Sequence, residues 1–182
     1  MKRNIILCIL TVGLVVAGYS QPNGEKEFGS PTTQMNVALL IYDDVELLDF
    51  AGPLEVFSLA SRDSKKLFNV YTVGLNTELI TSQKVLQIKP QYTLDNCPIP
   101  DILVLPGGDT RVIRKSEKLM KWLKYNIERI DVALSVCTGV SVLGEAGLLE
   151  NKTATTHKYA IESMKEKYPI PFSSESSMRW SM

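Results

Sequence analysis

The stretch that most constrains the fold of this chain is a short apolar run that ends in a cysteine. Residues 130–139 read IDVALSVCTG, and the central apolar residues are typical of a β-strand buried on both faces. Cys137 follows this strand, and Thr138 and Gly139 then open a segment with the apolar spacing of a short packed helix. A side chain held on a tight strand-to-helix turn is the arrangement called a nucleophile elbow. The pattern therefore predicts that Cys137 lies on a strained turn and acts as a nucleophile.

The helix expected after Cys137 should make its thiol more acidic. The N-terminus of a helix offers unpaired N–H groups and a partial positive charge, and both stabilise a thiolate. We therefore expect a lowered pKa for Cys137, and the alternative is an inert buried thiol, a common role for cysteine. Cys97 is the other cysteine beyond the first twenty residues. An oxidising compartment permits a disulfide between the two, but an elbow cysteine is poorly placed for a structural bridge, so we expect free thiols.

Buried strands alternate with helices along the rest of the chain. Residues 36–42 (NVALLIY) and 101–106 (DILVLP) are nearly continuous apolar runs, and residues 68–74 (FNVYTVG) form a further predicted strand. Two weaker strand-like pieces within residues 77–93 predict a small hairpin or edge addition. Helices are expected at residues 47–61, 116–130 and 159–168. The alternation predicts an α/β fold: a flavodoxin-like, mainly parallel sheet with helices on both faces, in a single domain at residues 35–182.

The carboxyl ends of three predicted strands carry the residues suited to chemistry. In open parallel sheets, ligands bind beyond these ends. The acidic segment 43–49 follows one strand, Gly107 and Gly108 follow a second, and Cys137 follows a third. Their convergence predicts a small-molecule site. The sequence contains no metal-ligand cluster, phosphate loop or nucleotide fingerprint, so we expect neither a metal nor another cofactor.

Residues 1–20 have the pattern of a secretory signal peptide. Basic residues precede a predominantly apolar run at residues 5–17, and cleavage after Ala17 or after Ser20 fits the small residues there. The alternative is an uncleaved membrane anchor, although the run is short for a membrane span. Residues 21–34 are rich in Gly, Pro, Ser, Thr and charged residues, which predicts a flexible tether. We therefore expect an exported protein, periplasmic or secreted, without a membrane attachment after signal removal.

The charge balance argues against nucleic acid as a partner. Lys plus Arg and Asp plus Glu each number 20 among 182 residues, so the formal net charge is 0. Proteins that bind nucleic acids or anionic membranes through charge carry an excess of positive residues. We expect a small-molecule substrate as the partner, and a homodimer is left open as the assembly.

Four motifs, in this order and spacing, resemble those of the ThiJ/PfpI family within the class I glutamine amidotransferase-like folds. They are LLDFAGPLEVF (residues 47–57), DILVLPGG (residues 101–108), SVCTG (residues 135–139) and GLLENKTATTH (residues 147–157). The branch that looks most similar is that of the isonitrile hydratases, together with the sensor domains of some AraC-type regulators. These proteins share the pattern D-x-x-G-P-x-x-V-F and the Cys-Thr-Gly elbow.

The resemblance assigns a nucleophile and an acid. Cys137 falls on the family nucleophile, and Asp49 falls on the acidic residue that contacts it, where many relatives have glutamate. A carboxylate beside a thiolate is disfavoured, so the pKa of Asp49 should rise and the acid can stay protonated as a donor. The alternative roles for Asp49 are a helix cap and a solvated acid. Glu46 and Glu55 are competing acids nearby, but the Asp-x-x-Gly-Pro context favours Asp49.

Other matching positions are predicted to bind substrate or to assist. Gly107 and Thr138 would offer backbone N–H groups to a developing negative charge, with Gly108 beside them, although a Gly-Gly pair also fits a simple tight turn. His157 is predicted as a third catalytic residue, and a structural or interface role is equally consistent with its position. The PfpI-type proteases have histidine directly after the cysteine. Thr138 in that position argues against peptidase activity.

One feature departs from the family pattern. The ThiJ/PfpI domain normally continues with a strand, a glycine-rich turn and a long C-terminal helix, whereas the sequence ends at Met182. The resemblance therefore implies a domain that lacks the last strand and helix.

The resemblance implies an exported cysteine-dependent enzyme that adds water across a small electrophile. Isonitrile hydratase-like chemistry, a lyase reaction, is favoured because Asp49 and Thr138 match that branch, and glyoxalase- or deglycase-like chemistry is the second choice. Two other readings stay open: a non-enzymatic redox-sensing or ligand-binding module, and an inactive truncated remnant.

Overall fold

A computed structural model of the chain describes residues 5–9 and 34–172. Its centre is a six-stranded sheet with the order β1-β10-β9-β2-β5-β8, in which neighbouring strands run parallel. The mainly parallel sheet that the sequence predicts is thus confirmed. The strands are β1 (Ile5–Ile9), β2 (Met35–Leu40), β5 (Phe68–Gly74), β8 (Tyr92–Thr93), β9 (Ile102–Leu105) and β10 (Val132–Val136).

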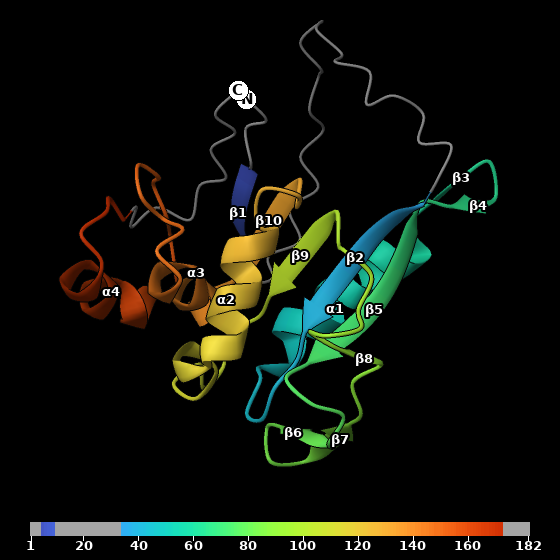
Figure 1. The fold of residues 1–182 in the computed structure, drawn as a ribbon, viewed down its shortest axis with the longest axis horizontal. Coiled ribbons are helices and arrows are strands. Elements are labelled where there is room, and N and C mark those ends of the chain that lie inside the picture. Colours follow the sequence, from blue (N-terminus) through green and yellow to red (C-terminus); the bar gives the residue numbers. More distant parts are fainter. Residues whose placement is uncertain (1–4, 10–33, 173–182) are drawn as a thin grey trace, which may run out of the picture.

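The strand order places helices on opposite faces of the sheet. From β2 the chain passes through α1 (Leu47–Leu59) to β5 on one side, and from β9 through α2 (Glu117–Asn126) to β10 on the other. Because such crossovers are right-handed, opposite directions of travel put their helices on opposite faces. Figure 1 shows α1 behind β2 and β5 and α2 in front of β9 and β10. The adjacent strands β2 and β9 form the switch point at which open α/β sheets bind ligands.

The helix α2 is shorter than the predicted segment 116–130. Ser116 caps its first turn, since the side-chain oxygen accepts an N–H from that turn. The helix ends at Asn126, whose buried amide bonds back to the helix and whose carbonyl accepts the N–H of Ile130 at 3.2 Å. The residues after Asn126 therefore form a turn, although their apolar spacing is helical.

The helix α1 carries a proline in its interior. The sequence pattern suggests that Pro53 lies in the first turn, where proline is tolerated. This expectation is wrong, because the helix begins at Leu47 and Pro53 falls in its second turn. Proline has no N–H, so the carbonyl of Asp49 lacks its usual helical donor.

The chain after β10 forms short helices. A 3₁₀ turn, η2 (Cys137–Gly139), leads into α3 (Val140–Glu145), and a second 3₁₀ turn, η3 (Lys158–Ala160), leads into α4 (Ile161–Lys167). The helix predicted at residues 159–168 is therefore present with a 3₁₀ first turn. Residues 153–156 have a strand-like sequence, but they contribute only one bridge, between Ala154 and Phe172.

Two small hairpins extend from the sheet. One is β3 (Ser61–Arg62) with β4 (Lys65–Lys66), and the other is β6 (Ile80–Ser82) with β7 (Leu86–Ile88). The second confirms the hairpin predicted within residues 77–93. The tip has three residues, 83–85, and Gln83 and Lys84 have φ values of 52° and 59°, the left-handed conformation that is common in tight hairpin turns.

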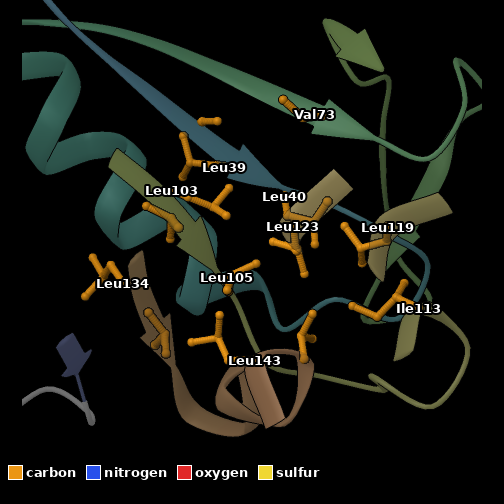
Figure 2. Packing of buried hydrophobic residues seen from close by; sticks show 14 of the residues in the cluster. Leu39, Leu40, Val73, Leu103, Leu105, Ile113, Leu119, Leu123, Leu134 and Leu143 are labelled. Carbon is orange, nitrogen blue, oxygen red and sulfur yellow. The ribbon is translucent and has the colours of Figure 1, made fainter. Parts of the chain in front are cut away.

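The buried core lies between the sheet and its helices. Leu39 and Leu40 on β2 and Leu105 on β9 are almost fully buried, as are Leu119 and Leu123 on α2. Figure 2 shows side chains of the sheet and of α2 and α3 in this one cluster. Each fully buried leucine contributes about 1.5–3 kcal/mol relative to an exposed one. The core therefore fixes the strand ends from which the site residues project.

The strand β1 comes from the predicted signal peptide and pairs with the outer edge of β10. The rest of residues 1–20, and residues 21–33 of the predicted tether, lie outside the described residues. The signal peptide, the tether and export therefore stay predictions. Within residues 5–9 and 34–172, no helix has the length and apolar character needed to span a bilayer.

Candidate active site

Hydrogen bonds draw the three predicted strand ends together. The N–H of Glu46, after β2, donates to the carbonyl of Gly107, after β9, with an N···O distance of 3.0 Å. The N–H of Gly108 donates to Oγ1 of Thr138 at 3.2 Å, and Thr138 directly follows Cys137. The structure thus brings together the acidic segment, the glycine pair and the cysteine that the sequence predicts to converge.

Cys137 lies on the strained turn that the elbow pattern predicts. Its φ is 55°, in the left-handed region, which is uncommon for residues other than glycine and costs about 1–3 kcal/mol. The buried Thr156 helps to hold this conformation, because its hydroxyl donates to the carbonyl of Cys137 at 3.1 Å. The thiol is half-buried, and both Cys97 and Cys137 are free, as expected.

The elbow packs directly on the end of β9. A Cβ atom at Gly139 would lie only 1.9 Å from the carbonyl oxygen of Leu105, so no other residue fits there without movement of the backbone. Glycine at position 139 therefore allows the turn that carries Cys137 to pack against the backbone of β9.

Asp49 places its carboxyl beside the Cys137 thiol. The residue is 8% exposed, its Oδ2 accepts the N–H of Gly107 at 3.0 Å, and it shares a side-chain hydrogen bond with Cys137. Burial raises the pKa of Asp49, the Gly107 N–H opposes this rise, and the charge of Glu46 adds to it. The predicted direction is confirmed, but the predicted cause is not, because burial raises this pKa and the hydrogen bond with Cys137 lowers it. Glu55 is exposed on α1, so Asp49 is the better placed of these two acids.

The thiol of Cys137 is less acidic than the sequence suggests. Burial first, and then the charge of Asp49, raise its pKa to about 11, so the expected lowering is wrong. The N–H of Thr138 bonds to the sulfur and does lower the pKa, as a helix N-terminus should. Lost hydration and the neighbouring carboxylate outweigh that single bond. When Asp49 carries a proton, its charge no longer opposes the thiolate, so the two acids titrate as a pair.

The two N–H groups predicted to face a developing negative charge are engaged. Gly107 donates to Asp49, and Thr138 donates to the sulfur of Cys137. A Cβ atom at Gly107 would lie 2.8 Å from both Asp49 Oδ2 and Thr138 N, so the close approach requires glycine. Gly108 has a φ of 114°, which also favours glycine. The roles of these residues toward a substrate stay predictions.

His157 lies on the edge of this arrangement. It is half-buried just before η3, and its ring packs edge-on against Tyr159 with a centroid distance of 5.4 Å. Its charge acts on Asp49 and lowers the pKa of that carboxyl, although less than the other causes do. The ring is therefore close enough to influence Asp49, and a catalytic role for it stays a prediction.

Two supporting residues escape the sequence analysis. The buried hydroxyl of Tyr42 lies 2.7 Å from the carbonyl oxygen of Gly107 and 2.9 Å from that of Pro106, and burial raises its pKa well above the usual range. It therefore stays protonated and holds the glycine turn. Thr156 supports the elbow from the other side. Tyr42 ends an apolar run, which is a weak signal of such a role, and nothing in the sequence distinguishes Thr156 from the threonines around it.

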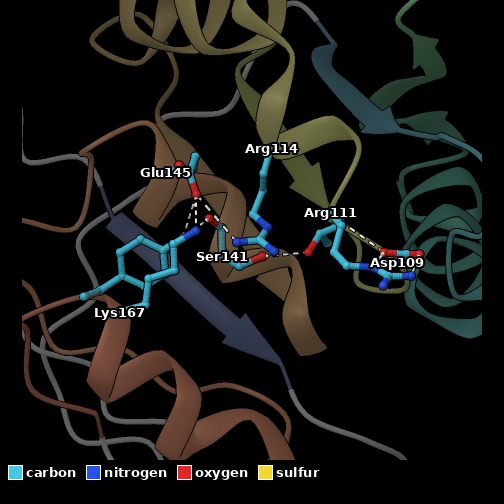
Figure 3. Close-up of polar contacts among 8 residues, drawn as sticks. Asp109, Arg111, Arg114, Ser141, Glu145 and Lys167 are labelled. Atoms are coloured by element: carbon cyan, nitrogen blue, oxygen red, sulfur yellow. Dashed lines mark hydrogen bonds and ion pairs between the residues drawn. The ribbon is translucent and has the colours of Figure 1, made fainter.

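A polar network fixes α3 behind the elbow (Figure 3). Glu145, at the end of α3, accepts hydrogen bonds from Lys167 at 2.5 Å and from the Tyr168 hydroxyl at 3.1 Å, and it forms an ion pair with Arg114 at 3.5 Å. The bond from Lys167 is the main reason that the pKa of Glu145 is lowered. These contacts tie α4 to the short helix that follows Cys137.

The same residues match a known family. The model of the DJ-1/PfpI family matches residues 35–170, which include the whole site. The chain belongs to the DJ-1/PfpI family. This confirms the resemblance to ThiJ/PfpI proteins that the four motifs suggest.

Curated relatives of this DJ-1/PfpI chain include an enzyme and a regulator. It is 35% identical to the isonitrile hydratase of Pseudomonas putida over 124 residues, which cover 68% of this chain and 52% of that protein. It is 25% identical to the HTH-type transcriptional regulator GbdR of Pseudomonas aeruginosa, over 74% of this chain and 37% of that protein. The chain thus spans about half, or less, of the length of these relatives.

Solved structures share the DJ-1/PfpI fold. A ThiJ/PfpI family protein from Pseudomonas syringae matches with a TM-score of 0.67 and 26% identity, over 82% of this chain and 64% of that one. Drosophila melanogaster DJ-1beta matches with a TM-score of 0.60 and 19% identity, over 77% of this chain and 73% of that one. The predicted flavodoxin-like fold is thus confirmed.

Proposed function

We propose that this DJ-1/PfpI chain is a cysteine-dependent enzyme that hydrates a small electrophile, with isonitriles as the first substrate class. The observation that carries the proposal is the hydrogen-bonded pair of Cys137, on a strained elbow, and the buried Asp49. A nucleophile paired with an acid of raised pKa suits addition reactions, in which one group attacks while the other moves a proton. The similarity to isonitrile hydratase supports this choice of chemistry.

The proposed reaction begins at the sulfur of Cys137. The thiolate forms a bond to the terminal carbon of the isonitrile, and the thiol proton reaches that carbon through Asp49, which gives a thioimidate. Water then adds to the same carbon while Asp49 takes its proton and passes it to the nitrogen. The carbon–sulfur bond breaks, the sulfur regains a proton from the new hydroxyl, and an N-substituted formamide leaves. Asp49 thus acts as acid and base in turn.

The test is to incubate the full chain with cyclohexyl isocyanide and to measure the N-cyclohexylformamide formed. Cys137→Ala should abolish turnover, and Asp49→Asn should reduce it about 10²- to 10⁴-fold. Cys97→Ala is the matched control and should keep the wild-type rate. Equal rates in wild type and Cys137→Ala would contradict the proposal. In the same assay, His157→Asn would show whether the histidine is catalytic, and methylglyoxal would test the glyoxalase-like alternative.

A second candidate function is a non-enzymatic sensor. The similarity to GbdR favours it, because a related domain occurs in a transcriptional regulator. In this case Cys137 would be oxidised by peroxide, with the protonated Asp49 donating to the oxidised sulfur. Mass spectrometry after mild peroxide treatment would support sensing if Cys137 alone were oxidised and no hydration were detected.

Three further expectations stay proposals from the sequence. They are export to the periplasm or the medium, assembly as a homodimer, and the absence of a nucleic-acid partner. Size-exclusion chromatography of the full chain tests the second directly.

A further inference from the structure

Glu46 is the second acidic residue at the site, and its backbone holds it there. It directly precedes α1, and its N–H donates to the carbonyl of Gly107 at 3.0 Å. Asp49 accepts the N–H of the same residue, Gly107, at 3.0 Å. Glu46 and Asp49 are therefore hydrogen-bonded to the carbonyl and to the N–H, respectively, of the same glycine at the turn beside Cys137.

The side chain of Glu46 is oriented by a residue from another part of the chain. Gln83, at the tip of the β6–β7 hairpin, donates its amide N–H to Oε1 of Glu46. Glu46 is half-buried as a residue, and its bond to the exposed Gln83 limits the directions that the carboxylate can take at the surface.

The hairpin that carries Gln83 is anchored to the sheet. The hydroxyl of Ser82, which is fully buried, donates to the carbonyl of Val45 at 2.7 Å. The N–H of Thr81 donates to Oδ1 of Asp43 at 2.8 Å, so the hairpin is fixed to the loop that leads to Glu46. The position of Gln83 is therefore set by buried and backbone contacts.

The charge of Glu46 acts on the thiol of Cys137 and raises its pKa. The charges that act most on the Cys137 thiol are those of Asp49 and Glu46, and both are negative. Asp109, which follows the glycine turn, forms a 2.5 Å ion pair with the exposed Arg111, which offsets its charge. An approaching substrate therefore meets a negative field at Cys137.

We propose that Glu46, oriented by Gln83, is a specificity-determining residue that disfavours anionic substrates at Cys137 and favours neutral or cationic electrophiles. The inference rests on the proposed function only in taking Cys137 as the reacting group. It names the substrate class by charge, and isonitriles, which are neutral, belong to the favoured class. Electrostatic selection of this kind acts on the approach of the substrate and weakens in high salt.

The test compares thiol reagents of different charge, so it does not depend on hydration. Cys137 is labelled with a cationic trimethylammonioethyl methanethiosulfonate and with an anionic sulfonatoethyl methanethiosulfonate, in a background in which Cys8 and Cys97 are replaced by Ala. The measured quantity is the ratio of the cationic to the anionic rate constant. A change in thiol pKa affects both reagents equally and cancels in the ratio. The neutral methyl reagent confirms that each variant keeps a reactive Cys137.

Glu46→Gln should lower the ratio about 3- to 10-fold, and 1 M salt should lower that of the wild type similarly. Glu55→Gln, which removes an exposed charge from the same helix, is the matched control and should leave the ratio unchanged. An unchanged ratio in Glu46→Gln, or an equal fall in Glu55→Gln, would overturn the proposal. A lowered ratio in Glu46→Gln without one in Gln83→Ala would overturn only the orienting role of Gln83. If no formamide forms but Glu46→Gln lowers the ratio, the hydratase function fails and this inference stands.

Discussion

The carboxyl of Asp49 and the thiol of Cys137 share a hydrogen bond, although they come from different strand ends of the sheet. The N–H of Gly107 holds Oδ2 of Asp49 at 3.0 Å, so the carboxyl cannot turn away from the sulfur freely. Burial raises the pKa of both groups, and the hydrogen bond between them raises the pKa of Cys137 further while it lowers that of Asp49. Loss of a proton from the pair therefore leaves one negative charge that the two groups share.

The first prediction concerns stability and pH. An acid whose pKa is higher in the folded state stabilises the fold fully below its unfolded pKa, about 3.9 for Asp. This contribution is lost as the pH rises through the folded-state pKa. Because the pKa of Asp49 is raised, Asp49→Asn should gain stability relative to the wild type as the pH rises from about 4 through the folded-state pKa. Urea denaturation across this range measures the difference, with Asp63→Asn on an exposed turn as control. A difference that does not change with pH would argue against a raised pKa.

The second prediction concerns the contact between the elbow and β9. Gly139→Ala would place a Cβ atom 1.9 Å from the carbonyl oxygen of Leu105, so the backbone must shift. We expect a loss of about 1–3 kcal/mol or more in the free energy of unfolding, and slower labelling of Cys137. Gly52→Ala is the control, because its Cβ atom meets nothing within 4 Å beyond its chain neighbours, so only the following Pro53 restricts it and the loss should be smaller. Equal stability of the two variants would rule out this contact as a constraint.

The third prediction concerns the support of the elbow by Thr156. Thr156→Val removes the hydroxyl that donates to the Cys137 carbonyl and leaves that carbonyl without this bond. We expect a loss of about 1–3 kcal/mol in the free energy of unfolding and a lower hydration rate. Thr156→Ser restores the hydroxyl and should recover the rate, whereas Thr153→Val, at an exposed position, should change neither quantity. If Thr156→Ser were as impaired as Thr156→Val, packing rather than the hydrogen bond would be responsible.

Sequence patterns predicted the sheet because buried parallel strands leave a strong signal. The apolar runs that became β2, β9 and β10 are covered on both faces, and this requirement is visible residue by residue. The positions of Asp49 and Cys137 followed from their motifs together with the rule that ligands bind at the carboxyl ends of strands. These features depend mostly on local sequence.

The features that the sequence did not reveal depend on the folded arrangement. The direction of the Cys137 pKa shift is set by lost hydration, which no local pattern reports. Thr156 and Gln83 contact the site from distant parts of the chain, and each has ordinary neighbours in the sequence. The start of α1 at Leu47 agrees with the prediction, and the position of Pro53 was misjudged because proline is expected in the first turn, whereas this helix continues through it.

The pairing of Cys137 with Asp49 is tested by the rate of iodoacetamide alkylation of Cys137 as a function of pH, in the full chain. Wild type and Asp49→Asn are compared, and Cys97, mapped separately by mass spectrometry, is the internal control. Burial and the Asp49 charge should give Cys137 an apparent pKa above the ordinary value of about 8.5 in the wild type. Removal of the charge in Asp49→Asn should lower this apparent pKa by about one pH unit, with no change at Cys97. The same apparent pKa for Cys137 in both proteins would contradict the proposed pairing of the thiol with Asp49.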